Sequence, residues 1–294
     1  PGGRRRCPHA RMKSAMQVHI YQPEYNRGWR PARWRIMVGD VWASRSLMWV
    51  LFKRGFTSTY RQTLFGWFGT VLDPLLMVAP FMTMAFAGIL KPGEINAPYP
   101  AFALIGLTFY HIGNESIRFC SNAVVQNQSM VLKVSFAKEA LVFSQLGRIL
   151  INMLIRFAVV ALILLAYWRP PAWTVVFLPA AMLPMYLFGL GVGLVLACMS
   201  VVLRDVGKYV GMLMPFFLLM SPILYARPRL PVLEAFNSVN PFAVLVNGPR
   251  DLILYGALQN PQPFYIMAAG SAVFFLLAWR LFHVSQPHLA AQLG

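Results

Sequence analysis

Residues 174–202 read TVVFLPAAMLPMYLFGLGVGLVLACMSVV and contain no Asp, Glu, Lys or Arg. An α-helix rises about 1.5 Å per residue, so about 20 residues cross the hydrocarbon core of a bilayer. Backbone groups inside lipid must be satisfied within their own segment, which makes a helix the expected structure. This stretch therefore predicts a transmembrane helix.

Five further apolar stretches of comparable length occur along the chain. Together the six predicted spans are residues 69–90, 99–117, 149–168, 174–202, 207–226 and 264–283. The chain is 58% hydrophobic and 12% charged, whereas soluble domains usually carry about 25% charged residues. We therefore expect an all-α integral membrane protein with six transmembrane helices over residues 66–283.

The net charge of +17 is placed as in a membrane protein. Thirteen of the 26 Lys and Arg residues precede residue 62, and most of the others lie at the ends of apolar stretches. Anionic headgroups and the positive-inside rule account for that distribution, so no nucleic-acid partner is expected. We expect residues 1–40 to form an irregular, basic, cytosolic arm without a signal peptide, and residues 284–294 to form a cytosolic tail.

An amphipathic helix is predicted for residues 41–65, directly before the first span. Basic and small polar residues recur every four positions from Lys53 to Gln62, and bulky apolar residues fill the opposite side. Such a helix lies in the plane of the membrane interface. The alternative is an ordinary amphipathic helix packed on the bundle.

An external segment is expected between spans five and six, at residues 227–263. Six prolines divide it. The apolar piece Phe242 to Tyr255 is too short to cross a bilayer, and its length suits a re-entrant hairpin tucked into protein. The alternative is a loop that lies on the outer surface.

Four segments together resemble ABC type-2 exporter permeases. They are YRQTLFGWFGTVLDPLL (Tyr60 to Leu76), SNAVVQNQSMVLKVSFA with the following Lys138, VVLRDVGKYV (Val201 to Val210), and SPILY (Ser221 to Tyr225) followed by Asn240-Pro241 and Arg250. Their order and spacing cover nearly the whole chain. Within that family the closest likeness is to permeases that export lipid-linked O-antigen or teichoic-acid chains, with capsular-polysaccharide permeases next.

The resemblance implies a transport subunit of the bacterial inner membrane and no catalytic site. The chain has no G-x-x-x-x-G-K-[ST] phosphate cradle, so ATP and Mg²⁺ are expected on a separate ATPase and no cofactor is expected here. The expected assembly holds two copies of this chain, two ATPase subunits and a lipid-linked polysaccharide. A drug or lipid exporter of the same architecture is the alternative.

The resemblance also implies roles for individual residues. Contact with the ATPase is expected at Arg61, Asn127, Lys133, Arg204 and Asp205, where headgroup contact or a solvated turn are the alternatives. The external gate is expected at Asn240, Pro241 and Arg250. The substrate path is expected at Phe81, Phe86, Arg156, Phe216, Phe217 and Tyr225, since aromatic faces stack on sugars; ordinary packing is the alternative.

Charged residues within spans usually face a bundle interior or water. His111, Glu115 and Arg118 share one helical face, which favours a structural Glu115–Arg118 pair. A proton relay is an alternative, and a metal site is another, although no third metal ligand is visible. Arg156 has three candidate roles: pairing with Asp73, contact with a phosphate, or lining the path. A Gly189–Gly193 pair predicts close helix packing, within one subunit or across a dimer.

An enzyme acting on lipid-linked sugars is a further alternative. It would need paired acidic groups or a His–acid pair near one membrane face. The nine acidic residues include no such closely spaced pair of carboxylates. The three cysteines show neither metal-ligand spacing nor a disulfide framework.

Overall fold

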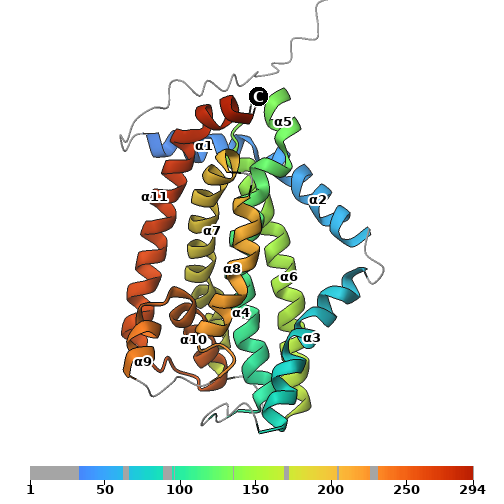
Figure 1. Ribbon diagram of the computed structural model, residues 1–294, viewed down its shortest axis with the longest axis vertical. Coiled ribbons are helices and arrows are strands. Elements are labelled where there is room, and N and C mark those ends of the chain that lie inside the picture. Colours follow the sequence, from blue (N-terminus) through green and yellow to red (C-terminus); the bar gives the residue numbers. More distant parts are fainter. Residues whose placement is uncertain are drawn as a thin grey trace, which may run out of the picture.

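The computed structural model describes residues 33–61, 66–88, 95, 97–134, 136–168, 172–203, 205–225 and 231–293. Within these ranges the regular structure is helical, with no β-strand (Figure 1). The helices are α1 (Arg33–Ala43), α2 (Arg45–Arg61), α3 (Gly66–Phe86), α4 (Tyr99–Gln126), α5 (Gln128–Lys133), α6 (Glu139–Ala166), the 3₁₀ helix η2 (Trp173–Phe177), α7 (Leu178–Val202), α8 (Val206–Met220), α9 (Pro231–Val239), α10 (Pro241–Leu254) and α11 (Pro261–Leu293).

Each of the six predicted spans coincides with a helix, namely α3, α4, α6, η2 with α7, α8 and α11. Three helical segments of the described chain are long and apolar enough to cross a membrane: Glu139–Ala166, Trp173–Val202 and Pro261–Leu289. Two apolar segments are shorter, Leu75–Phe86 and Val206–Met220. The all-helical fold class is thus confirmed, with helix ends that differ from the expected ones by several residues.

Helix α4 forms the centre of the bundle. Most of its 28 residues are buried, and it packs against α3, α6, α7, α8 and α10. Helix α4 packs closely against α7 because α7 has glycine at two contact positions. A Cβ on Gly189 would lie 2.6 Å from the Cβ of Ser116, and a Cβ on Gly193 would lie 2.6 Å from the Cβ of Cys120. The glycine pair therefore packs α7 on α4 within one subunit.

Helix α11 runs along the bundle beside α7 and ends next to α5. It continues to Leu293 as one helix with Pro287 inside it, so residues 284–293 extend the predicted sixth span rather than forming a separate tail. The reason is burial, since Gln286 and Leu289 are both enclosed by neighbouring elements.

Helix α1 begins at Arg33, within the segment expected to be irregular. Tertiary contacts order it: Met37 is fully buried and its sulfur lies 3.0 Å from a guanidinium nitrogen of Arg280, while Trp34 packs edge-on against Trp279. The rest of the predicted arm, residues 1–32, lies outside the described residues.

Helix α2 covers most of the predicted interfacial segment, of which residues 62–65 lie outside the described residues. It leads outward from the bundle and contacts α6 (Figure 1). The contact centres on Phe52, whose ring would lie 2.7 Å from a Cβ on Gly147. Trp49, also on α2, is mostly exposed. Helix α2 therefore both packs on the bundle and presents an apolar surface.

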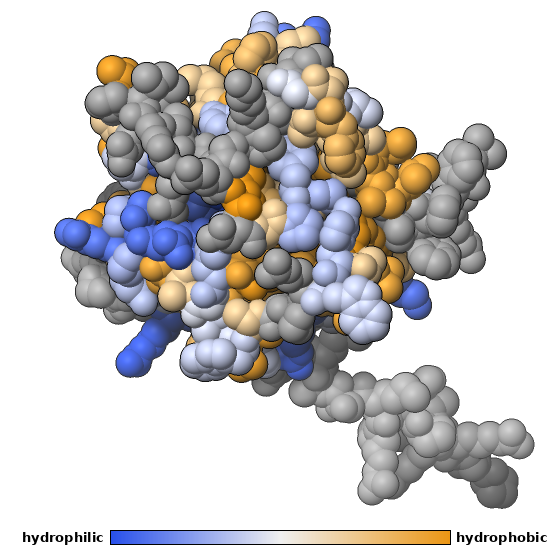
Figure 2. Space-filling model, turned by 90° about the horizontal axis from the view of Figure 1, so that it is seen from below, coloured by the Kyte–Doolittle hydropathy of each residue, from blue (hydrophilic) through white to orange (hydrophobic). Residues whose placement is uncertain are grey.

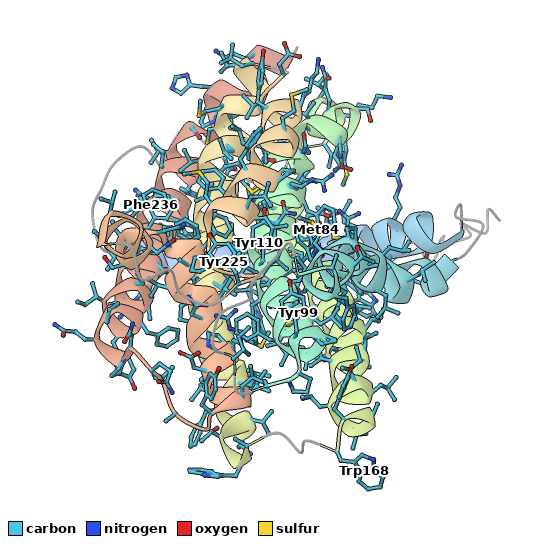
Figure 3. The ribbon with its side chains drawn as sticks, turned by 60° about the horizontal axis from the view of Figure 1, so that its bottom comes forward. Met84, Tyr99, Tyr110, Trp168, Tyr225 and Phe236 are labelled. Carbon is cyan, nitrogen blue, oxygen red and sulfur yellow. The ribbon has the colours of Figure 1, made fainter. Side chains whose placement is uncertain are left out.

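The two ends of the bundle differ in content. One end, here called the α5 end, holds α1, α5 and the last residues of α11; the opposite end, the α10 end, holds α9 and α10 (Figure 1). Seen from the α10 end, hydrophilic side chains gather on one side of the face, and hydrophobic residues occupy much of the other (Figure 2). Trp168 projects away from the bundle at this end (Figure 3).

Candidate functional site

Helix α10 is a short, largely buried helix that covers most of the apolar piece Phe242 to Tyr255. It starts with Asn240, whose Oδ1 accepts a hydrogen bond from the Phe242 backbone N–H at 3.0 Å. Pro241 follows at the first helical position, where its missing N–H costs nothing. The Asn240 Nδ2 also donates to Ser221 Oγ at 2.8 Å, which ties the start of α10 to the turn after α8.

Arg250 ties the other end of α10 to the same turn. Its Nη1 donates to the Ile223 carbonyl at 2.9 Å, and its Nη2 donates to Asn247 Oδ1. The guanidinium carbon lies 3.9 Å from the centre of the Phe102 ring on α4. Gly106 makes room for the turn, because a Cβ there would lie 2.7 Å from the Ile223 oxygen. Two of the predicted gate residues, Asn240 and Arg250, are thus both bonded to the turn after α8, at Ser221 and Ile223.

Glu115 and Arg156 form an ion pair between α4 and α6. An Oε1–Nη2 distance of 2.5 Å joins them, and Glu115 Oε2 accepts from Asn152 Nδ2 at 2.9 Å. The expected Glu115–Arg118 pair is therefore wrong: Asn152 and Arg156, four residues apart on α6, face Glu115 from across the interface. Arg156 pairs with Glu115, and the side chain of Asp73 lies outside the described residues. Within those residues no group of three or more His, Cys, Asp or Glu could hold a metal ion.

The aromatic residues expected along a substrate path differ in exposure. Phe86 on α3 is 80% exposed and Phe216 on α8 is 64% exposed. Phe217 is partly covered, with its ring 5.6 Å from that of Phe242, and Phe81 packs against the main core. The Tyr225 hydroxyl lies 3.3 Å from the Leu219 carbonyl, where it closes the last turn of α8.

Helices α3 and α8 both pack against α4 and carry exposed apolar side chains besides these rings (Figure 1). On α3 they include Leu76, Met77 and Met84; on α8 they include Met212, Leu213 and Met220. Tyr110, in contrast, lies within the bundle and donates to the Met214 carbonyl (Figure 3). Helices α3 and α8 therefore each pack one face against α4 and leave another, apolar face exposed.

The residues expected to contact an ATPase lie at the α5 end where the structure describes them. Asn127 joins α4 to α5, and its Nδ2 donates to the Ala123 carbonyl at 2.8 Å. Lys133 and Asp205 are exposed. Exposed apolar side chains accompany them: Leu132, Val134, Val202 and Leu203. Arg204 and the side chain of Arg61 lie outside the described residues.

Several residues contact the predicted site residues although the sequence did not indicate those contacts. Ser221, Ile223 and Phe102 contact gate residues only because the fold brings three separate segments together, and Asn152 meets Glu115 across 37 positions. The spacing of Asn152 and Arg156 on one face of α6 was an available hint. Ser221 and Ile223 lie in the SPILY segment, but nothing in that segment indicates which residues they contact.

These features are those of a helical membrane protein in which Glu115, Arg156 and Arg250 are held inside the bundle. The sequence model of the ABC-2 type transporter family matches residues 46–254. The chain therefore belongs to the ABC-2 type transporter family and is a membrane permease domain, a transport subunit. Permeases of this family pair with nucleotide-binding ATPase subunits.

Three curated proteins similar to this chain carry one description, O-antigen export system permease protein RfbA. The protein of Myxococcus xanthus is 23% identical over 257 residues, which cover 86% of this chain and 98% of that protein. Two proteins of Klebsiella pneumoniae are 23% and 21% identical, covering 72% and 80% of this chain and 82% and 93% of their own lengths. The similarity thus extends over nearly the full length of these relatives.

Proposed function

We propose that this chain is the permease subunit of an exporter that moves a lipid-linked, O-antigen-like polysaccharide across the bacterial inner membrane. The observation that carries the proposal is the similarity to O-antigen export permeases over nearly their whole length. Exposed aromatic residues on α3 and α8 support it, since ring faces stack on sugars without a fixed sequence requirement.

Six helices span the membrane in this proposal: α3, α4, α6, α7 with η2, α8 and α11. Helix α4 is not among the three long apolar helices because it carries polar and charged residues. Most of its residues are nevertheless buried by neighbouring helices. A charged group surrounded by partners avoids most of the cost that lipid would impose. The Glu115–Arg156 pair is the main example.

In this proposal the α5 end faces the cytosol, and both termini are assigned to the cytosol as well. The basic residues of the segment before α3 support this orientation, chiefly Lys53, Arg54 and Arg61 close to the first span. Exposed Trp42 and Trp49 on α1 and α2 suit the cytosolic membrane interface, and exposed Trp168 and Trp173 suit the opposite one.

The functional unit is a dimer of this chain with two ATPase subunits, which bind ATP and Mg²⁺. At the α5 end, Lys133 and Asp205 provide charges beside the apolar Leu132 and Leu203. An exposed apolar group rimmed by charge, outside the lipid, is typical of a protein contact. Arg61, Asn127 and Arg204 are assigned to the same contact.

The polymer passes between the two copies, along the exposed sides of α3 and α8, past Phe86, Phe216 and Phe217, with the partly buried Phe81 and Tyr225 beside the path. Arg156 is held against Glu115 inside the bundle and does not line this path. Asn240, Pro241 and Arg250 hold α10 as an external gate. Because these residues join α10 to the turn after α8, a displacement of α8 would displace the gate with it.

Depletion of the chain in its native cell tests this function. The proposal predicts that complete lipid-linked polysaccharide accumulates on the cytosolic side while its synthesis continues, and that surface polysaccharide disappears. If surface polysaccharide is unchanged and the cells become more sensitive to a drug, a drug exporter of the same architecture is favoured. If it is unchanged and a lipid is retained in the inner membrane, a lipid exporter is favoured.

A further inference from the structure

A second buried polar cluster lies at the α5 end, away from the gate and the substrate path. It joins the first residues of α6 to α11 across nearly half of the chain. Glu139 Oε1 lies 2.5 Å from His283 Nδ1, and Lys138 Nζ donates to the Gln286 carbonyl at 3.0 Å. The Lys138 backbone N–H also lies 3.3 Å from Gln286 Oε1. We name these four residues the latch.

The latch is enclosed by protein. Glu139 and Gln286 are fully buried, and His283 and Lys138 are nearly so. Burial lowers the pKa of the Lys138 ammonium, and the neighbouring Glu139 carboxylate raises it in part. Hydrogen bonds and ion pairs in such surroundings are costly to leave unmade, so the latch holds α6 and α11 in one arrangement.

The latch lies next to α5, the helix proposed to receive the ATPase. Residues 134–137 are all that separate α5 from Lys138. Val131 on the inner side of α5 belongs to the same buried apolar cluster as Phe282 and Leu289 of α11, and α5 contacts α11 directly. Helix α5 is therefore seated on α11 both by apolar packing and through the latch that follows it (Figure 1).

The opposite end of α11 packs on the gate helix. Phe264, in the first turn of α11, is buried against Gly248 of α10, where a Cβ would lie 2.4 Å from the Phe264 ring. The 26 residues of α11 that precede Pro287, residues 261–286, rise about 39 Å at 1.5 Å per residue. A single helix thus touches the ATPase-facing helix at one end and the external gate helix at the other.

We infer that the latch makes α11 a lever that carries a displacement of α5 across the membrane to the gate helix α10. This inference rests on the proposed function and adds to it a second route, because α5 is otherwise joined to the bundle through α4 and the start of α6. In this account Lys138, Glu139, His283 and Gln286 are positioning residues, which act through α11 and not on the polymer.

The test uses the whole complex of permease and ATPase in proteoliposomes, with a cysteine at Val239, which is exposed just before the gate residue Asn240. The variants are Glu139→Gln and His283→Phe. Ser271→Ala is the matched control, since it removes a buried hydroxyl of α11 that bonds only within its own helix, to the Met267 carbonyl. Lys138→Met leaves the Glu139–His283 pair in place and serves if the stronger variants fail to accumulate.

We expect each latch variant to bind the ATPase and to hydrolyse ATP within about twofold of the unaltered complex. Export should fall at least tenfold, and the ATP-dependent change in the labelling rate of Val239→Cys should disappear. Latch variants that export normally and keep that change would overturn the inference, as would an equal loss in Ser271→Ala. An unaltered chain that binds no ATPase would overturn the proposed function itself, and the inference with it.

Discussion

Arg250 holds α10 through contacts with three separate parts of the molecule. Its guanidinium bonds the Ile223 carbonyl after α8 and Asn247 within α10, and lies over the Phe102 ring of α4. The side chain is almost fully buried. A planar group with several donors suits this position, whereas a lysine ammonium offers a single point charge.

Replacing Arg250 with Met should therefore destabilise the protein. The Ile223 carbonyl and the Asn247 side chain would lose their donor, at a cost of about 1–3 kcal/mol. The thermal unfolding midpoint of the purified permease measures this. Lys133→Met is the control, because an exposed charge usually changes stability by less than about 0.5 kcal/mol. Equal midpoints for both variants would show that Arg250 does not hold α10.

Two neighbouring aromatic residues on α8 should respond differently to the same substitution. Phe216 is mostly exposed, so Phe216→Leu should leave the unfolding midpoint unchanged while slowing export of the polymer. Phe217 contacts the Phe242 ring, and Phe217→Leu should cost about 0.5–1.5 kcal/mol. Export assays and thermal unfolding separate the two effects. Normal export by Phe216→Leu would remove that ring from the substrate path.

At the scale of elements, the packing of α7 on α4 depends on the absence of side chains at two positions. A Cβ on Gly193 would lie 2.6 Å from the Cβ of Cys120 and 3.1 Å from the Ser116 carbonyl oxygen. Neither neighbour is the far end of a flexible side chain, so the helices would have to separate. Such separation would loosen contacts along the centre of the bundle.

Gly193→Ala should therefore lower the unfolding midpoint, although alanine is the better helix former by about 1 kcal/mol. Gly270→Ala on α11 is the matched control, since nothing lies within 4 Å of a Cβ there. It should leave the midpoint unchanged or raise it. If both variants gain stability, α4 and α7 are not in the close contact described above.

The helices themselves were largely predictable, because a long apolar stretch has few alternatives to a helix in lipid. Their ends were less so. Helix α6 begins at Glu139, ten residues before the predicted span; packing on α2, together with the contacts of Glu139 with His283 and of Phe143 with Trp279 of α11, orders that first part. Helix α1 forms for the same reason. Residues far apart in sequence supply these contacts, so no local sequence pattern predicts them.

The candidate site was predictable at the level of segments and less so at the level of partners. Asn240-Pro241 was expected only as part of the gate segment, and the structure shows in addition that Asn240 caps α10. The pairing of Glu115 followed sequence proximity to Arg118 and was wrong, because α6 presents Asn152 and Arg156 to the same carboxylate. The rotation of α6 against α4 decides that choice, and a single sequence does not specify it.

At the scale of the whole molecule, the arrangement predicts which end faces the cytosol. In intact cells a membrane-impermeant thiol reagent should label Val232→Cys on α9, an exposed position at the α10 end, and should spare Lys133→Cys on α5. Both sites should react after the cells are opened. The reverse pattern would place the α5 end outside and would remove the proposed ATPase contact.

Taken as a whole, the molecule has the proposed ATPase contact at the α5 end and the short buried helix α10 at the other end, with exposed apolar helix faces between them. ATP enters this scheme only through the partner, so the permease alone should neither bind nor hydrolyse it. The chain has no phosphate-binding loop motif that would support such binding. Movement of polymer should therefore require both proteins.

Reconstitution of the permease and its ATPase in proteoliposomes containing lipid-linked polysaccharide tests this most directly. The measurement is the fraction of polymer that becomes protected from, or exposed to, a glycosidase added outside the vesicles. We predict a change in that fraction that requires ATP, the ATPase and this chain together. Polymer that stays in place while the assembled complex hydrolyses ATP, or that moves when this chain is left out, would contradict the account.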